Sequence, residues 1–213
     1  MLSLGFPDGR IYTLSSGTSQ QEIPMNRIEP LDRDSVPDSL QPVLDFSEQV
    51  MGFTANDVLT MAKWPELLQA MQPMVGVIYG PGKLDDGLKR LVALVVSTAA
   101  GCRYCQAHTA HGAQAVNVDA DKIGAVWEFE TSDLFNAAER AALRVARDAG
   151  ITPNGVSDTD FAALREHFDE RQILEIVAII SLFGFLNRWN STLATTIEPV
   201  PAQLLAQISQ GTN

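Results

Sequence analysis

The residues with the clearest chemical potential are two cysteines and two histidines in the middle of the chain. Cys102, Cys105, His108 and His111 fall within one short segment, and the chain holds no other cysteine. A helix that starts near the first cysteine places Cys102 beside free backbone N–H groups, where a thiolate is stabilised. Cys105 then lies one turn further on, close enough for a disulfide. Such a pair attacks an oxidant, forms a sulfenic acid and resolves it as a disulfide.

The two histidines extend this chemistry to proton transfer. His108 follows Cys105 by three residues, so both share a helix face and the imidazole is placed to move a proton. The spacing C-x-x-C-x-x-H-x-x-H also offers ligands of the kind that bind zinc. Steps of three residues rotate by about −60° around an α-helix, so Cys102 and His111 lie on opposite sides. We therefore expect no metal site, and a pair that merely packs is the structural alternative.

The composition limits the class of partner. The chain has 213 residues, of which 46% are hydrophobic, and a formal net charge of −11 at pH 7. This length buries a sizeable core, and the acidic excess argues against nucleic acid or an anionic membrane surface as partners. Two cysteines are too few for a disulfide-stapled secreted domain. With no leader-like start and no apolar run near about 20 residues, we expect a soluble, cytoplasmic protein.

The chain divides into an arm and a helical domain. Residues 1–37 are rich in prolines and turn formers, which predicts an extended arm with a short strand at 10–14. Residues 38–213 show helical spacing of apolar residues and no long alternation, which predicts an all-α domain. The expected helices are 39–51, one capped by Asn56, one from near Pro65 to 78, 84–99, 102–115, 119–126, 136–149 with Gly150 just past its end, 158–167 behind a capping box at Ser157 and Asp160, and 169–187.

Two apolar segments of this domain resemble one another. Residues 89–96 align with 174–181 at an offset of 85 residues, and the same offset places Cys102 over Asn187 and Cys105 over Asn190. Buried helices look alike when both are rich in Leu, Val, Ala and Ile, but here the polar positions that follow also correspond. We therefore expect an internally duplicated helical unit whose first copy keeps the thiols.

Around these residues the sequence resembles the AhpD-like alkylhydroperoxidase and carboxymuconolactone decarboxylase superfamily, in particular its peroxidase-related members. The resemblance rests on the apolar helix 88–97 followed by Gly101-Cys102-Arg103-Tyr104-Cys105, and on residues 136–143 and 183–190. It covers about residues 40–198. It implies an AhpD-like all-α fold, a homo-oligomer (dimer, trimer or hexamer) and peroxidase chemistry. In that chemistry Cys105 matches the cysteine that attacks peroxide, and Cys102 matches the cysteine that resolves it.

The sequence departs from the family pattern at two positions. The relay histidine of the family, four residues after the second cysteine, is Thr109 here, and His108 stands one residue early. The activating glutamate, twelve residues before the first cysteine, is Arg90, which stabilises a thiolate but cannot accept its proton. Glu175 occupies the matching place in the second copy, so we expect it to approach the cysteines as the base. His111 is the alternative relay residue.

These features lead to three functional hypotheses. The first is a thiol-dependent hydroperoxide reductase that uses Cys105 and Cys102, needs no cofactor and is reset by a dithiol or a lipoyl-bearing protein. The second is a carboxymuconolactone decarboxylase-like enzyme, against which the intact C-x-x-C counts, because acid/base groups suffice for that reaction. The third is a non-enzymatic, redox-sensing oligomer, which the missing glutamate favours.

Overall fold

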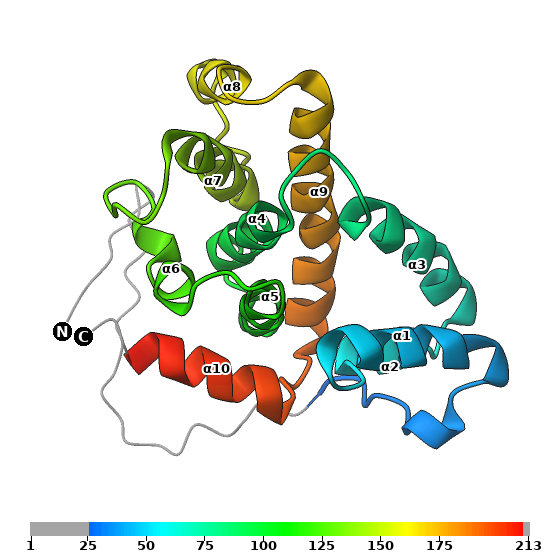
Figure 1. The fold of residues 1–213 in the computed structure, drawn as a ribbon. Helices are drawn as coiled ribbons and strands as arrows, with labels where there is room; N and C mark the ends of the chain where they lie inside the picture. Colours follow the sequence, from blue (N-terminus) through cyan, green and yellow to red (C-terminus); the bar gives the residue numbers. More distant parts are fainter. Residues whose placement is uncertain (1–25, 211–213) are drawn as a thin grey trace, which may run out of the picture.

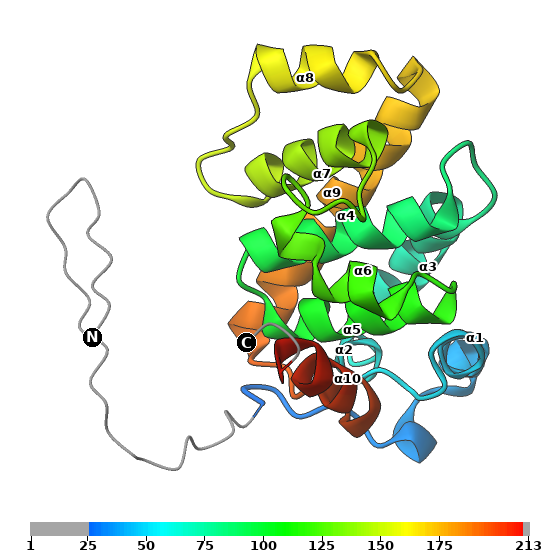
Figure 2. The same ribbon diagram turned by 60° about the vertical axis from the view of Figure 1, so that its left-hand side comes forward.

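The computed structural model describes residues 26–210, and every regular element within them is helical. The prediction of an all-α fold is confirmed (Figures 1 and 2). Three short 3-10 turns accompany the α-helices. The α-helices are α1 (Gln41–Met51), α2 (Asn56–Met61), α3 (Pro65–Tyr79), α4 (Asp86–Ala99), α5 (Arg103–Ala115), α6 (Ala120–Gly124), α7 (Ala137–Gly150), α8 (Asp158–Arg165), α9 (Glu170–Leu193) and α10 (Pro199–Gln210).

Helix α9 forms the axis around which the other long helices are arranged (Figure 1). Helices α4, α5 and α7 pack against it, and the main hydrophobic core lies between them, with Leu91, Val95, Leu143 and Ile176 fully buried. A second core cluster lies under α1, α2 and the start of α3. Each buried aliphatic side chain contributes roughly 1.5–3 kcal/mol. The main core therefore holds rigid the corner between α4 and α5, where the cysteines lie.

One of the two predicted helix-start caps is present in the structure. The predicted capping box of Ser157 and Asp160 is confirmed at α8, and α7 and α9 begin with boxes of the same kind. The predicted cap at Asn56 is wrong, because Ala55 precedes α2 and makes no side-chain cap. The Asn56 side chain instead donates to the Thr196 carbonyl at 2.9 Å, so it ties α2 to the segment after α9.

Gly150 lies inside the last turn of α7, not past its end as predicted. A Cβ atom there would lie 2.8 Å from the Ala99 Cβ and 3.0 Å from the Val96 carbonyl oxygen. Only a residue without a side chain allows this approach. Gly150 therefore permits close packing of α7 on α4 and does not end the helix.

Helix α9 continues beyond its predicted end at residue 187, to Leu193. With 24 residues and a mean hydropathy of 1.3 over its most apolar window, it is the one described helix long and apolar enough to cross a membrane. Of that window, 44% is buried inside the protein, and five helices contact α9: α3, α4, α5, α7 and α8. These contacts are those of a core helix, which meets the same criteria of length and composition.

The predicted arm is described only from residue 26 onward, and the strand expected at 10–14 lies outside the described residues. The Arg27 backbone N–H donates to the Leu193 carbonyl at 2.8 Å, and its guanidinium donates to the Thr192 carbonyl at 2.6 Å. Val36 is buried in the second core cluster. The last part of the predicted arm thus packs against the helical domain of the same chain.

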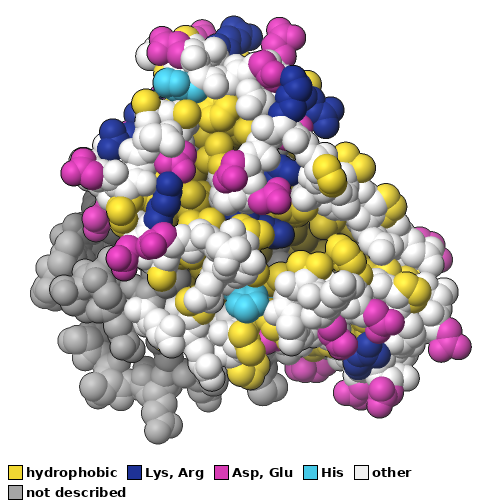
Figure 3. All heavy atoms as spheres, in the orientation of Figure 1, with side chains coloured by type: hydrophobic (Ala, Val, Ile, Leu, Met, Phe, Trp, Pro, Cys, Tyr) yellow, Lys and Arg dark blue, Asp and Glu magenta, His cyan; other side chains and the backbone are white. Residues whose placement is uncertain are grey.

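The surface of the domain combines scattered charge with exposed hydrophobic side chains. Figure 3 shows acidic side chains distributed over one face and hydrophobic side chains visible between them. Trp64, Val77 and Leu174 are among the most exposed large hydrophobic residues, at 60%, 73% and 64%. Two of them, Trp64 and Val77, lie at the two ends of α3, toward the right-hand side of Figure 1.

Candidate active site

The two cysteines lie at the corner where α4 ends and α5 begins. Gly101 follows α4 with a φ of +71°, a left-handed conformation that glycine adopts without a Cβ penalty, and Cys102 then caps α5. The Cys105 N–H donates to the Cys102 Sγ at 3.3 Å, and the two sulfur atoms are 2.8 Å apart. Both are free thiols and both are buried. The expected position of Cys102 at a helix start is confirmed, and the sulfurs are placed to react with each other.

Their surroundings separate the acidities of the two thiols. The hydrogen bond from the Cys105 thiol lowers the pKa of Cys102 to about 7, although burial opposes this shift. The Cys105 backbone N–H and the Ser191 side chain lower it further. The same shared hydrogen bond, together with burial, raises the pKa of Cys105. The pair therefore loses its first proton as one unit, with the negative charge favoured on Cys102.

Helix α9 reaches the thiols through Asn190. Its Nδ2 lies 3.6 Å from the Cys105 Sγ and 3.3 Å from the Asp57 Oδ2, and the side chain is buried. The amide thus bridges the second cysteine and a carboxyl group from α2. As a donor it stabilises negative charge on Cys105, but it cannot remove the Cys105 proton.

Four polar side chains beside this bridge form what we call the acid–base cluster: Asp57, Tyr104, His108 and Glu198. The Glu198 Oε2 lies 2.5 Å from the His108 Nε2, and its Oε1 accepts from the Tyr104 hydroxyl at 2.9 Å. The same hydroxyl lies 3.2 Å from the Asp57 Oδ1. Tyr104 and His108 are one turn apart on α5 and stack with ring centroids 4.1 Å apart. The cluster joins α2, α5 and the residue that precedes α10.

The two carboxyl groups of the acid–base cluster differ in charge. Burial raises the pKa of Asp57; the charge of His108 opposes this rise and that of Glu198 adds to it. Burial also raises the pKa of Glu198, but the hydrogen bond and charge of His108 outweigh it, so the net shift is downward. One hydroxyl proton on Tyr104 cannot serve two carboxylates. Burial thus favours the neutral form of Asp57, His108 favours the ionised form of Glu198, and the Tyr104 hydroxyl lies within hydrogen-bond distance of both carboxyl groups.

The structure separates the two predicted histidines. His108 belongs to the acid–base cluster, whereas the His111 Nε2 lies 2.8 Å from the Met51 carbonyl oxygen at the end of α1. Thr109, at the relay position of the family, donates its hydroxyl to the Cys105 carbonyl at 2.7 Å and is thereby engaged with its own helix. Of His108, His111 and Thr109, only His108 belongs to the acid–base cluster.

The structure does not bring Glu175 to the thiols within the described chain. Glu175 lies fifteen residues before Asn190 on α9, a rise of about 22 Å along the helix. Its Oε2 accepts from the backbone N–H groups of Lys83 and Leu84 at 3.0 and 3.1 Å. The expectation that Glu175 approaches the cysteines is therefore corrected: it holds the loop before α4, and Glu198 is the carboxylate beside the site.

Arg90, at the position of the family glutamate, lies over an aromatic ring. Its guanidinium carbon is 4.0 Å from the centroid of the Tyr79 ring. Burial raises the pKa of Tyr79 to about 12; the charge of Arg90 opposes this rise, and that of Cys105 adds to it. The pair of Arg90 and Tyr79 thus places a positive charge in the neighbourhood of the thiols and supplies no base.

Sequence reasoning missed both carboxyl groups of the acid–base cluster. Glu198 is the only acidic residue after Glu175, and Asp57 is the only one between Glu48 and Glu66. An isolated acid in an apolar stretch is a usable signal, because a buried carboxyl group needs partners. The partners themselves lie 47 and 90 residues away along the chain, and only the packing of the helices shows which residues they are.

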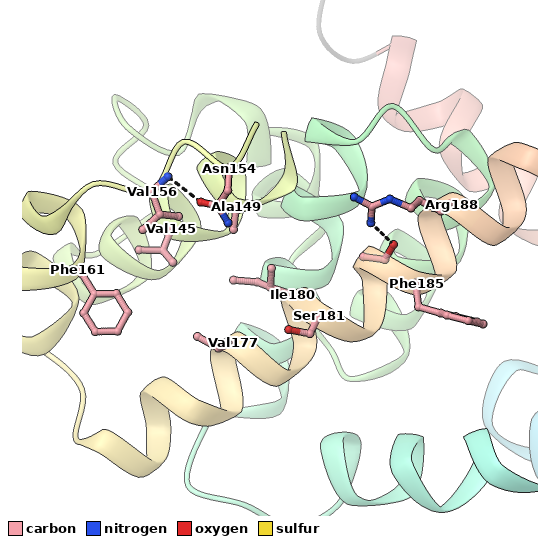
Figure 4. A pocket seen from close by; sticks show the side chains of 11 residues that line it. Val145, Ala149, Asn154, Val156, Phe161, Val177, Ile180, Ser181, Phe185 and Arg188 are labelled. Atoms are coloured by element: carbon pink, nitrogen blue, oxygen red, sulfur yellow. Dashed lines mark hydrogen bonds between the residues drawn. The ribbon is translucent and has the colours of Figure 1, made fainter. Parts of the chain in front are cut away.

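Two adjoining cavities lie along α9 on the side of Cys102. The first, which we call the thiol-side cavity, has a volume of about 610 Å³ and is lined by residues of α4, α7 and α9 that include Asn187, Arg188 and Ser191. The second, the apolar cavity, has a volume of about 570 Å³ and lies between α7, α8 and α9 (Figure 4). Ser191 lines the thiol-side cavity, and its side chain is one of the groups that lower the pKa of Cys102, so the cavity lies on the Cys102 side of the pair.

Comparison with known proteins agrees with this architecture. The sequence model of the carboxymuconolactone decarboxylase family matches residues 65–148, from the start of α3 to the last turn of α7. The uncharacterized protein YnjA of Escherichia coli (strain K12) is 32% identical over 160 residues, which are 73% of this chain and 85% of YnjA.

Solved structures share the fold over most of the chain. The debrominase Bmp8 has a TM-score of 0.80 and 39% identity, covering 85% of this chain and 97% of Bmp8. A cysteine-to-alanine variant of Bmp8 in complex with 2,3,4-tribromopyrrole has a TM-score of 0.81 and 38% identity, covering 85% of this chain and 96% of the variant. The AhpD core of a peroxidase-related protein from Ralstonia eutropha JMP134 has a TM-score of 0.74 and 22% identity, covering 84% of this chain and 95% of that protein. The chain therefore belongs to the carboxymuconolactone decarboxylase family and has the AhpD-like all-α fold.

Proposed function

We propose that the protein is a dithiol reductase that reduces an organic hydroperoxide to an alcohol with Cys102 and Cys105. The observation that carries this proposal is the pair of free sulfurs, 2.8 Å apart at the start of α5, one of them with a pKa lowered to about 7. A large fraction of Cys102 is then thiolate at neutral pH, the form that attacks peroxides. Decarboxylation, for which the family is named, consumes no thiol, so the intact pair favours redox chemistry.

We infer that Cys102 attacks and Cys105 resolves, which reverses the order that the family resemblance implies. Cys102 has the lowered pKa, its sulfur accepts from the Cys105 backbone N–H at the start of α5, and Ser191, which also lowers this pKa, lines the thiol-side cavity. Cys105 has a raised pKa and faces the buried amide of Asn190. A protonated thiol is a poor nucleophile toward peroxide, but Cys105 is well placed to close a disulfide with a sulfur 2.8 Å away.

The reaction balances with two thiols and one hydroperoxide. The Cys102 thiolate attacks the terminal peroxide oxygen, the O–O bond breaks, and the alkoxide takes one proton and leaves as an alcohol. Cys102 is now a sulfenic acid. The Cys105 sulfur attacks the Cys102 sulfur, the S–O bond breaks, and water leaves with the Cys105 proton as the disulfide forms. A dithiol or a lipoyl-bearing protein then returns two electrons and resets the pair.

The acid–base cluster holds and moves the protons in this scheme. His108 shares the α5 face of Cys105, and Glu198 holds its imidazole at 2.5 Å. In this scheme its imidazolium first gives a proton to the leaving alkoxide, and the neutral imidazole then takes the Cys105 proton and passes it to the leaving water. The protonated Asp57, joined to Cys105 through Asn190, is the proton reserve for the leaving oxygen. Glu198 and Asn190 are positioning residues in this scheme, because they act on His108 and Cys105.

The test mixes the reduced protein with cumene hydroperoxide and follows the loss of thiols. We expect one hydroperoxide consumed per cysteine pair, and continued turnover when dithiothreitol is present. Cys102→Ser should lose the reaction. Cys105→Ser should react once and accumulate a sulfenic acid that dimedone labels at Cys102.

Two outcomes would contradict parts of this proposal. Consumption no faster than by dithiothreitol alone would reject hydroperoxide reduction. If Cys105→Ser loses the reaction and dimedone labels Cys105 in the Cys102→Ser variant, the order implied by the resemblance holds and our assignment of the attacking thiol is wrong. Thermal unfolding of both variants is the control for folding.

The similarity to Bmp8 favours a second candidate, reductive debromination of an aromatic ring. As in the reduction of a hydroperoxide, the two thiols supply two electrons and end as a disulfide. The Cys102 thiolate takes the bromine as a sulfenyl bromide while the ring carbon takes a proton, and Cys105 then displaces bromide to form the disulfide. Reduced protein incubated with 2,3,4-tribromopyrrole should release bromide, and Cys102→Ser should not. No release above that of dithiothreitol would reject this candidate.

We further propose that the protein assembles with copies of itself and works in a reducing compartment such as the cytoplasm. The exposed hydrophobic side chains of Trp64 and Val77 at α3, and of Leu174 on α9, are the kind of surface that a second copy covers. Light scattering should give a mass of two, three or six times 23.1 kDa. A monomer at micromolar concentration would contradict the proposal.

A further inference from the structure

The thiol-side cavity contains a buried amide without a partner. Asn187 lines the cavity and is 4% exposed, and neither its Oδ1 nor its Nδ2 has a hydrogen-bond partner in the part of the chain that the structure describes. Buried amides in folded proteins are almost always hydrogen-bonded to protein, water or ligand. Asn187 lies one helical turn before Asn190, whose Nδ2 is 3.6 Å from the Cys105 Sγ, and before Ser191, whose side chain lowers the pKa of the Cys102 thiol. Its amide is therefore placed to bind a molecule that approaches this thiol.

Two arginines of the same cavity donate to main-chain carbonyl groups. Arg27 donates to the Thr192 carbonyl and Arg188 donates to the Gly184 carbonyl, each at 2.6 Å. Neither forms an ion pair with a carboxylate among residues 26–210. Each guanidinium has five N–H donors, and the unused ones favour an anion supplied by a ligand.

The apolar cavity continues the thiol-side cavity along α9. The two share Ala149, Ile180, Gly184 and Arg188. Figure 4 shows Phe161 at one end of the apolar cavity and Arg188 at the other, with Ile180 between them. A volume of about 570 Å³ suits a small organic molecule. A ligand held at Arg188 can therefore extend its hydrocarbon part toward Phe161.

We propose that the two cavities together bind an apolar organic acid as substrate. Arg27 and Arg188 hold its anionic group, the apolar cavity takes its hydrocarbon part, and Asn187 donates to its reactive oxygens beside Cys102. The inference rests on the proposed function, because it names the substrate class of the same thiols: an organic hydroperoxide that carries one carboxylate. Charge-assisted hydrogen bonds to a guanidinium then distinguish this acid from a neutral hydroperoxide.

The test compares linoleic acid 13-hydroperoxide with its methyl ester, which differ in the negative charge. For the wild-type protein we expect a kcat/KM about tenfold higher for the acid than for the ester. Arg188→Gln should remove most of this preference by lowering the value for the acid alone. Arg171→Gln is the matched control, because it removes a positive charge from α9 outside both cavities and should change neither value.

Asn187→Leu provides a second variant, because leucine keeps the volume and removes the unpaired amide. We expect it to lower kcat/KM for the acid and to raise the melting temperature, since a buried amide without partners destabilises the free protein. A rise in melting temperature with unchanged kinetics would assign Asn187 a packing role and contradict its place in the site. Equal kcat/KM for acid and ester, or an equal loss with both substrates in Arg188→Gln, would overturn the proposal as a whole.

A binding experiment distinguishes failure of this inference from failure of the proposed function. The alcohol 13-hydroxyoctadecadienoic acid cannot be reduced, so its calorimetric titration into the reduced protein reports on the cavities alone. We expect binding that weakens about tenfold in Arg188→Gln and in the methyl ester. Binding without turnover of any hydroperoxide would reject the reaction and retain the ligand class. Turnover of cumene hydroperoxide without binding of the hydroxy acid would reject the ligand class and retain the reaction.

Discussion

The segment formed by α4 and α5 aligns with α9 at an offset of 85 residues, yet the first segment is broken and the second is one continuous helix. In the first, Gly101 turns the chain with a φ of +71° and Cys102 begins a new helix. In the second, Leu186 and Asn187 occupy the corresponding positions inside α9. The local difference is a glycine in place of a leucine, because glycine enters the left-handed region without a Cβ penalty.

The break decides which copy carries the reactive group. The helix start places the Cys105 thiol and the Cys105 backbone N–H beside the Cys102 sulfur, and both hydrogen bonds lower the pKa of Cys102. The uninterrupted α9 has no such start there and contributes side chains only. Three side chains of α9 share the helix face that is turned toward the thiols: Asn187, Asn190 and Ser191. Asn190 and Ser191 follow Asn187 by three and four residues, which places them one turn further along the helix. One copy supplies the nucleophile, and the other supplies its surroundings.

Removal of the direct contact between the two copies should have the largest effect. Asn190→Leu deletes the donor to Cys105 and leaves the Asp57 carboxyl without its amide partner. We expect the rate of disulfide formation with cumene hydroperoxide to fall about a hundredfold, as when one donor to a developing charge is lost. Stopped-flow measurement of tryptophan fluorescence checks this, with circular dichroism as the control for folding. A rate close to that of the wild type would mean that α9 contributes only packing here.

A matched pair of glutamate variants tests which carboxylate serves the site. Glu198→Gln removes the charge that holds His108, and kcat should fall about tenfold at unchanged KM, the usual size of a lost charge-assisted hydrogen bond. Glu175→Gln keeps an acceptor for the backbone N–H groups of Lys83 and Leu84 and should leave kcat unchanged. The opposite result would restore Glu175, the residue that the internal alignment predicts, as the base.

The break itself can be tested through stability. A Cβ at Gly101 would meet nothing within 4 Å, so Gly101→Ala isolates the cost of the positive φ. We expect a loss of about 1 kcal/mol in the free energy of unfolding by urea. At the aligned position in α9, Leu186→Gly should be less stable than Leu186→Ala by about 0.5–1 kcal/mol, because glycine weakens a helix interior. A neutral Gly101→Ala would show that the corner does not depend on glycine.

The smallest expected effect concerns the titration of the attacking thiol. Alkylation of the reduced protein by iodoacetamide should rise with pH through a midpoint of about 7, the pKa of Cys102. Because this pKa lies below the ordinary value of 9.0, the folded state binds fewer protons between these values, so stability should increase with pH in that window. Ser191→Ala removes one donor and should move the midpoint upward by a fraction of a pH unit. A downward move would contradict the role of Ser191.

Much of the site was predictable where its residues are close in sequence. Cys102, Cys105 and His108 lie within two turns of one helix, so spacing alone places them near one another. The base was not predictable in this way. The internal alignment points to Glu175, but the aligned segments do not share the corner, and the carboxylate beside His108 comes from the residue before α10, a helix that no apolar pattern predicted.

The sequence by itself determined the all-α class, the family, most helix positions and the thiol pair, because caps, helical periodicity and the C-x-x-C spacing act over a few residues. The tertiary structure decided the partners of that pair. Asp57, Asn190 and Glu198 reach α5 from segments 47 to 94 residues away, and their approach depends on how helices pack. The pKa values of the two thiols differ first because of the hydrogen bond that they share, which the C-x-x-C spacing sets locally. Burial and the Ser191 and Asn190 side chains of α9 shift them further, and these contributions depend on the packing of the helices.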